Sequence, residues 1–230
     1  MSFLEVTAFL FDGFKISLLI FAVTLLCGAP LGLPIAFCSM SRFKIVKSIT
    51  KVIVWVVRGI PLMLQIFIIY YVPGLLFNYQ IFGKIDRFMF IEYGLSDMGR
   101  ITAVLIAFTI NYACYFSEIY RGGIESIPKG QYEAASVLGY NKQQTFFKII
   151  FPQMVKRVLP PVTNEVITLV KDTSLAFVLT YEEMFTVAKQ IAAAQTTIMP
   201  LFVAGVFYFI FNAVVAFAME RIEKKLSYYR

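Results

Sequence analysis

The sequence predicts an all-α integral membrane domain, and two observations lead to this prediction. The chain has 230 residues, of which 59% are hydrophobic and only 15% are charged, a composition too apolar for a soluble globular domain. Its apolar residues also collect in segments long enough to cross a hydrocarbon core, which takes about 20 helical residues. We therefore expect a single transmembrane domain over residues 1–230, with spans near 13–38, 50–73, 100–121, 156–179 and 198–219.

Charged residues between these spans predict the orientation of the chain, because loops rich in lysine and arginine stay in the cytosol. The connection after the first span carries four basic residues and no acidic one: Arg42, Lys44, Lys47 and Lys51. The connection 74–99 holds three acidic and two basic residues, whereas 121–157 holds six basic and two acidic residues. We expect the N-terminus outside the cell and the C-terminus in the cytosol.

Prolines lie inside three of the spans, where each removes a backbone donor from the helix. They are Pro30, Pro34, Pro61, Pro160 and Pro161. We expect kinks or interruptions there, with the freed carbonyls satisfied by partners on neighbouring helices.

Residue types argue against several classes of function. The chain has no histidine and no visible pairing of a nucleophile with a base, so we predict neither a catalytic site nor an enzyme. Cys27, Cys38 and Cys114 lack metal-ligand spacing, so we expect no metal site and no disulfide. The net charge of +7 comes from loops beside apolar spans, which membrane topology explains better than nucleic-acid binding does.

The basic connection 121–157 contains a short polar segment between two helix breakers. Pro128 is tolerated in a first helical turn, and Gly139 is a favourable helix terminator. The segment from Gln131 to Leu138 is therefore predicted to form a short cytosolic helix.

The residues of this segment resemble a known motif. They are Glu133, Ala134, Ala135, Gly139 and Pro152, with Phe151 where leucine is usual. Their spacing is similar to that of the coupling loop in permease subunits of bacterial ABC importers. The resemblance implies that Glu133 docks on an ATPase subunit and that Ala134 and Ala135 let two backbones approach closely. It also implies that Gly139 ends the helix in a tight turn.

Two further segments extend the resemblance along the chain. Arg58 to Tyr71 reads RGIPLMLQIFIIYY, and Lys171 to Leu175 reads KDTSL. Both look like signatures of the polar amino acid branch of these permeases, which includes histidine-, glutamine-, arginine- and cystine-type members. Together with the loop they cover most of residues 58–185 in the order that the family requires, so the chain is identified as a member of that branch.

The resemblance implies a five-transmembrane-helix ABC importer permease fold in the bacterial cytoplasmic (inner) membrane. Such a subunit pairs with a second permease, identical or homologous, with two ATP-binding subunits and with an extracytoplasmic solute-binding protein that delivers an amino acid. The chain has no G-x-x-x-x-G-K-[ST] phosphate loop, so it cannot hydrolyse ATP alone. We expect no cofactor on it, with ATP and Mg²⁺ on the partner ATPase.

Polar residues within the apolar spans are costly, so each is a functional hypothesis. The candidates, span by span, are Arg58 and Gln65; Asn111, Tyr115 and Glu118; and Glu165, Thr168 and Asp172. Within each span these residues are three, four or seven positions apart, which places them on one helical face. We expect the three polar faces to meet in a common interior.

A zwitterionic amino acid needs donors for its carboxylate and acceptors for its ammonium group. Glu165 is the principal predicted contact, and it or Glu118 would accept from the ammonium. A helix interruption from Asp172 to Ser174 would turn free N–H groups, with the Thr173 and Ser174 hydroxyls, toward the carboxylate. The other predicted contacts are Gln65, Asn111 and Tyr112.

Other interpretations stay open at this stage. Arg58, Glu118 and Lys171 are structural or gating residues if they pair with other charges to hold the helices together. The main alternative function is a secondary, ion-coupled amino acid transporter, although such proteins usually have internal repeats and more spans. A membrane scaffold that uses the polar faces only as assembly contacts is a further alternative. The sequence leaves open which amino acid is moved.

Overall fold

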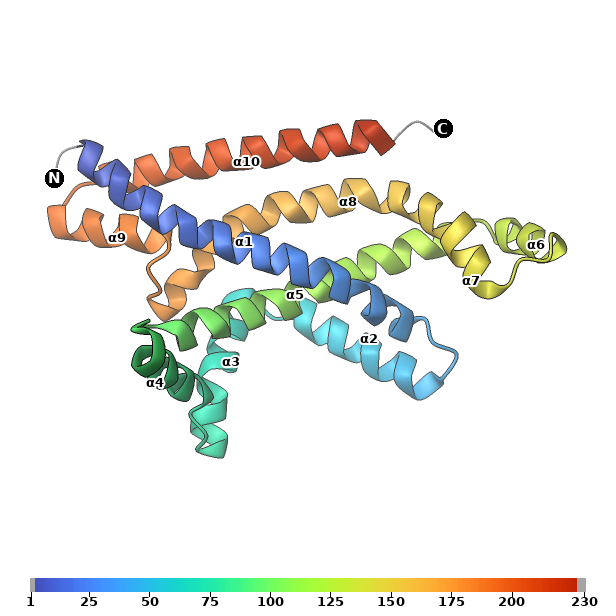
Figure 1. Ribbon diagram of the computed structural model, residues 1–230, viewed down its shortest axis with the longest axis horizontal. Helices are drawn as coiled ribbons and strands as arrows, with labels where there is room; N and C mark the ends of the chain where they lie inside the picture. Colours follow the sequence, from blue (N-terminus) through green and yellow to red (C-terminus); the bar gives the residue numbers. More distant parts are fainter. Residues whose placement is uncertain (1–2, 227–230) are drawn as a thin grey trace.

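The computed structural model describes residues 3–226, and every regular element in that range is helical. Four long helices extend along the longest dimension of the molecule (Figure 1). They are α1 (Phe3–Ser39), α5 (Met98–Glu125), α8 (Phe151–Asp172) and α10 (Met199–Leu226). α1 and α8 continue through the prolines that the sequence placed in them.

The core of the protein lies between α1 and α5. Phe108, Tyr112 and Phe116 of α5 are buried there, and α1 presents small residues toward them. A Cβ atom built at Gly32 would lie 2.7 Å from the Cβ of Phe116, closer than two carbon atoms can approach. Glycine therefore lets the backbones of α1 and α5 come close enough to bury these aromatic rings.

The predicted second span is two helices that meet at a sharp bend. α2 (Lys44–Gly59) ends just before Pro61, and α3 (Leu62–Phe77) begins just after it. The two axes differ in direction by 108°. This confirms the interruption predicted at Pro61 within the span 50–73.

Shorter elements connect the long helices. α4 (Ile81–Tyr93) joins α3 to α5, and α6 (Lys129–Val137) follows α5. α7 (Lys142–Thr145) continues through a π-helical turn, η1 (Phe146–Ile150), into α8. A 3₁₀ helix, η2 (Thr173–Leu179), extends α8 and leads to α9 (Met184–Gln195).

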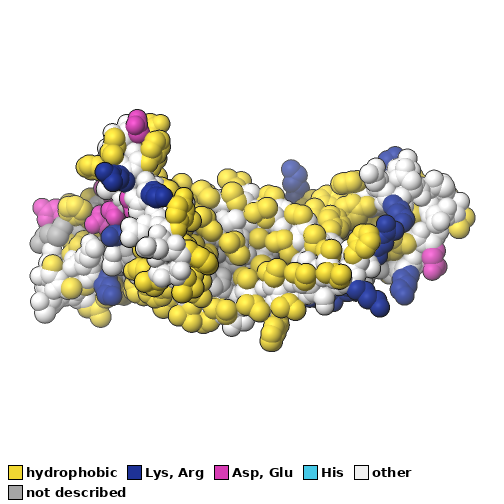
Figure 2. Space-filling view, turned by 90° about the horizontal axis from the view of Figure 1, so that it is seen from below, with side chains coloured by type: hydrophobic (Ala, Val, Ile, Leu, Met, Phe, Trp, Pro, Cys, Tyr) yellow, Lys and Arg dark blue, Asp and Glu magenta, His cyan; other side chains and the backbone are white. Residues whose placement is uncertain are grey.

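The helices differ in how well they suit a bilayer. Of the described residues, α1, α5 and α10 are long and apolar enough to cross one, and the bent α2–α3 pair is a possible fourth crossing. α8 with η2, which covers the predicted span 156–179, is not among them, because charged side chains interrupt it. Figure 2 shows apolar side chains covering the middle of the molecule and charged ones at both ends, with basic ones predominating where α6 and α7 lie. An apolar surface of this extent is what a lipid-embedded protein exposes.

A buried carboxylate joins three helices at the opposite end. Glu183, the N-cap of α9, is fully buried and accepts hydrogen bonds from the backbone N–H groups of Phe185 and Thr186. It also accepts from the hydroxyls of Ser17 on α1 and Tyr208 on α10, at 3.3 and 3.2 Å. Glu183 therefore fixes α9 against α1 and α10.

Candidate functional site

The bend between α2 and α3 opens a cavity of about 520 Å³ toward α5 and α8. The bend supplies Arg58 and the backbone that follows it, α5 supplies Asn111, Tyr112 and Tyr115, and α8 supplies Glu165, Thr168 and Asp172. The three polar faces that the sequence predicted from helical spacing therefore do meet around one space. This volume suits a small molecule of amino acid size.

Among residues 3–226, Arg58 is the one cationic side chain that lines this cavity. Its guanidinium carbon lies 4.9 Å from the ring centre of Tyr115, a cation–π distance. One guanidinium nitrogen is 3.7 Å from the Glu118 carboxylate. Glu118 itself is held by Arg121 at 2.7 Å, so Glu118 pairs with two arginines at the edge of the site. Arg58 thus keeps donors available to the cavity.

Two acidic groups face Arg58 from α8. The Tyr112 hydroxyl donates to a carboxylate oxygen of Asp172 at 2.7 Å. Glu165 is half-buried, and among the described residues no side chain or backbone group donates to its carboxylate. Glu165 therefore keeps its hydrogen-bond acceptors free at the cavity. When ionised, Arg58, Glu165 and Asp172 together carry a charge of −1.

Several predicted contacts lie away from the cavity lining. The Thr173 and Ser174 hydroxyls donate to backbone carbonyls three residues earlier, those of Val170 and Lys171. Lys171 is exposed. Glu118 is outside the lining, and the amide of Gln65 donates to backbone carbonyls of Val57 and Ile60. Thr173, Ser174 and Gln65 thus bond to backbone carbonyls, and Glu118 to arginine, instead of facing the cavity.

The predicted helix interruption at Asp172–Ser174 is absent from the structure, so that expectation was wrong. Thr173 has right-handed helical dihedral angles, and its N–H bonds to the carbonyls of Leu169 and Lys171. The helix tightens to 3₁₀ geometry without a break, and no free N–H groups are released there. The break in this region of the molecule is the one at Pro61, on the opposite wall of the cavity.

A short helix, α6, is present where Gln131–Leu138 was predicted, two residues longer at its start and one shorter at its end. Gly139 follows with φ +76°, the left-handed conformation in which glycine ends a helix. Glu133 and Ala134 are exposed, whereas Ala135 is buried against its own chain. Of the predicted docking residues, Glu133 and Ala134 are free to meet a partner.

The loop that carries α6 is tied to α8. The Arg157 guanidinium donates to the backbone carbonyl of Ser126 and to its hydroxyl. Asn141 and Gln144 form a reciprocal capping box at the start of α7. The loop before α6 is therefore held against α8, the helix that also carries Glu165 and Asp172.

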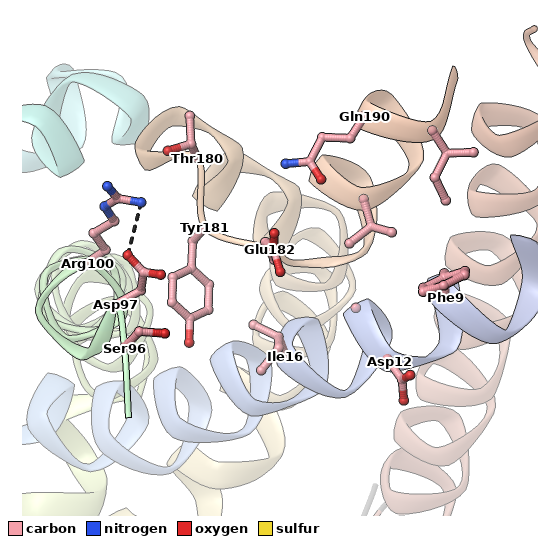
Figure 3. A pocket seen from close by; sticks show the side chains of 13 residues that line it. Phe9, Asp12, Ile16, Ser96, Asp97, Arg100, Thr180, Tyr181, Glu182 and Gln190 are labelled. Carbon is pink, nitrogen blue, oxygen red and sulfur yellow. Dashed lines mark ion pairs between the residues drawn. The ribbon is translucent and has the colours of Figure 1, made fainter. Parts of the chain in front are cut away.

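A second cavity, of about 630 Å³, lies at the end of the molecule that carries Glu183. Figure 3 shows Asp12 and Ile16 of α1 and Gln190 of α9 around it, with Tyr181 between them and the Asp97–Arg100 ion pair. Asp97 and Glu182 are exposed to solvent. No site was predicted here from the sequence, since Asp97 and Glu182 lie in connections between helices.

Comparison with known proteins finds one transport family and relatives that span nearly the whole chain. Residues 28–228 match the family described as "Binding-protein-dependent transport system inner membrane component". The probable amino-acid ABC transporter permease protein YckA of Bacillus subtilis (strain 168) is 32% identical over 227 residues, covering 98% of this chain and 92% of YckA. The arginine transport system permease protein ArtQ of the same organism is 32% identical over 220 residues, covering 95% and 93%.

The fold also matches a solved structure. A chain in the crystal structure of an amino acid ABC transporter with histidines superposes with a TM-score of 0.79 and 25% sequence identity. The superposition covers 98% of this chain and 99% of that one.

Proposed function

This chain belongs to the family of binding-protein-dependent transport system inner membrane components, and we propose that it is the permease subunit of an ATP-driven amino acid importer. The observation that carries the proposal is the cavity at the α2–α3 bend, which combines one cationic and two acidic groups with an apolar surround. A zwitterion needs this combination, because both of its charges must be met where water is scarce.

The substrate would bind with its carboxylate toward Arg58 and its ammonium group toward Glu165. Arg58 takes the role first assigned to Thr173 and Ser174, whose hydroxyls are already bonded to backbone. Asn111 and the Tyr112–Asp172 pair would orient the amino acid between these two ends. Guanidinium groups suit carboxylates because several N–H donors point in one plane.

Coupling to ATP hydrolysis would run through α6. Val137 and Leu138 are 88% and 72% exposed at the basic end of the molecule, which is typical of an apolar surface that another protein covers. Glu133 lies beside them. ATPase subunits that draw two such helices together would pull on α8 through the Arg157–Ser126 contact. The cavity would then open to alternate sides of the membrane.

The remaining assembly follows from the family. Two ATP-binding subunits, which hold ATP and Mg²⁺, a second permease and an extracytoplasmic solute-binding protein would complete the importer. We also propose five crossings in the bacterial inner membrane, with α8 and η2 as the fourth. In Figure 1 the N-terminus and the C-terminus lie at opposite ends, and α6 is at the end of the C-terminus. This arrangement supports an outer N-terminus and a cytosolic C-terminus.

The direct test is reconstitution of the purified complex in liposomes, with the ATPase and binding protein that accompany it. We expect one class among arginine, histidine, glutamine and cystine to stimulate ATP hydrolysis and to accumulate inside. Uptake that follows a proton or sodium gradient, with no associated ATPase, would contradict the proposal.

The substitution Glu133→Arg tests the coupling helix. It reverses the charge of an exposed residue of α6, so we expect loss of ATP-driven uptake with normal membrane insertion. Gln143→Arg, which adds a charge on nearby α7, is the matched control and should leave uptake near the wild-type rate. Normal uptake by Glu133→Arg would remove α6 from the mechanism.

A further inference from the structure

The bend between α2 and α3 leaves backbone carbonyl groups without helical hydrogen-bond donors within the apolar part of the molecule. The last carbonyls of a helix have no partner within it, and Pro61 has no N–H to offer. The carbonyl of Val56 accepts from the N–H of Ile60, but this contact satisfies only one of the orphan groups. An unpaired carbonyl in apolar surroundings is costly, so the bend needs donors from elsewhere.

Gln65 supplies them. It lies in the first turn of α3, and its side chain reaches back over the bend, as helical side chains tend to point toward the N-terminus. Its amide nitrogen donates to the carbonyl of Val57 at 2.6 Å and to that of Ile60 at 2.8 Å. A carboxamide NH₂ has two hydrogens, so both are used. Gln65 is 8% exposed, which shields these bonds from water.

The two carbonyls lie on either side of Arg58 in the sequence. The Arg58 side chain is long, flexible and 40% exposed, and its main contacts are the Tyr115 ring at 4.9 Å and Glu118 at 3.7 Å. Such loose contacts do not place the side chain by themselves, so the backbone at residues 57–60 decides which region the guanidinium can reach. Holding that backbone in place keeps the guanidinium within reach of the cavity.

We propose that Gln65 is a positioning residue: it clamps the α2–α3 bend and thereby holds Arg58 toward the substrate cavity. This differs from a direct substrate contact, because Gln65 is not part of the cavity lining and has no donor left for a ligand. The effect on substrate affinity rests on the proposed function, whereas the effect on the bend does not.

The first test measures the bend without substrate. Spin labels at Ile53 of α2 and Ile68 of α3, both about half exposed, would report the α2–α3 distance in complexes with one labelled permease, after replacement of Cys27, Cys38 and Cys114. Gln65→Met keeps the length of the side chain but removes both donors, so we expect a broader distance distribution. Leu64→Met, its exposed neighbour, is the control and should leave the distribution unchanged. An unchanged distribution in Gln65→Met would overturn the clamp.

The second test asks whether Gln65 acts through Arg58. With the amino acid that most stimulates the wild-type complex as probe, we expect Gln65→Met and Arg58→Met each to raise the KM of uptake about tenfold. The double variant should be no worse than Arg58→Met alone. Additive effects would contradict positioning and favour a direct contact. If Gln65→Met does not assemble, Gln65→Asn, with its amide one methylene shorter, carries the same two expectations.

The two tests separate the inference from the proposed function. If none of the amino acids is transported, the proposed function fails while the distance measurement still decides the clamp. If transport occurs and the distance distribution does not respond to Gln65→Met, the clamp fails alone.

Discussion

The carboxyl groups of Glu183 and Glu165 are both withdrawn from bulk water, but they differ in how many donors reach them. Glu183 is fully buried and accepts from two backbone N–H groups and three hydroxyls. The donors are Phe185, Thr186, Ser17 and Tyr208. Glu165 lines a cavity, and within residues 3–226 it accepts no hydrogen bond.

The difference separates a structural acid from a functional one. A buried carboxylate with every acceptor occupied is satisfied by the protein itself and holds helices in place. A carboxylate left without donors beside an open cavity must be satisfied by water or by a ligand. Burial alone does not distinguish a structural acid from a functional one; the number of hydrogen-bond donors that reach the carboxylate does.

The largest loss of stability is expected for the substitution that takes the acceptor away from the most hydrogen-bond donors. Glu183→Ala would remove the shared acceptor of five donors: the N–H groups of Phe185 and Thr186 and the hydroxyls of Thr186, Ser17 and Tyr208. We expect a loss of at least about 3 kcal/mol of stability, seen as a lower unfolding midpoint and poor assembly in detergent.

The neighbouring acid provides the control for that experiment. Glu182→Ala removes the same charge one residue earlier, but Glu182 is exposed, so its unfolding midpoint should stay near that of the wild type. Equal midpoints for the two variants would show that the hydrogen bonds of Glu183 do not hold the three helices together.

Substitution of Glu165 is expected to lower stability less than substitution of Glu183 and to impair transport directly. Glu165→Gln keeps the size of the side chain but removes the negative charge that would meet an ammonium group. We expect uptake at low substrate to fall about tenfold, equivalent to about 1.4 kcal/mol, with little change in unfolding midpoint. Glu92→Gln on exposed α4 is the matched control. A large drop in stability with unchanged uptake would reverse the assignment.

The sequence could predict Glu165 but not Glu183, and the reason is physical. Glu165, Thr168 and Asp172 repeat at helical spacing within an apolar span, so their common face follows from local geometry. Glu183 stands next to Glu182 between two predicted spans, where the sequence pattern predicts solvated charges. Its burial depends on Ser17, 166 residues away in the sequence, and local pattern carries no information about such a contact.

The same reasoning applies to the backbone of the site. Pro61 predicted an interruption, because proline removes a helical donor wherever it lies. It could not predict a 108° bend, which also depends on Gln65 and on the packing of α5. The break expected at Thr173 was wrong because the Thr173 hydroxyl donates to the Val170 carbonyl of its own helix instead of turning toward the cavity.

The smallest change in transport is expected for substitution of Tyr112. Within the described residues, its hydroxyl is the one donor to an acid of the cavity, Asp172. Tyr112→Phe removes the 2.7 Å bond to Asp172 but keeps the buried ring. Because the cavity admits water, a water molecule can replace the hydroxyl, so we expect KM to rise only about threefold. Tyr115→Phe, which keeps the ring beside Arg58, should change KM less. If Tyr112→Phe instead unfolds the protein as Glu183→Ala does, Asp172 belongs with the structural acids, and the cavity retains Glu165 alone as its free carboxylate.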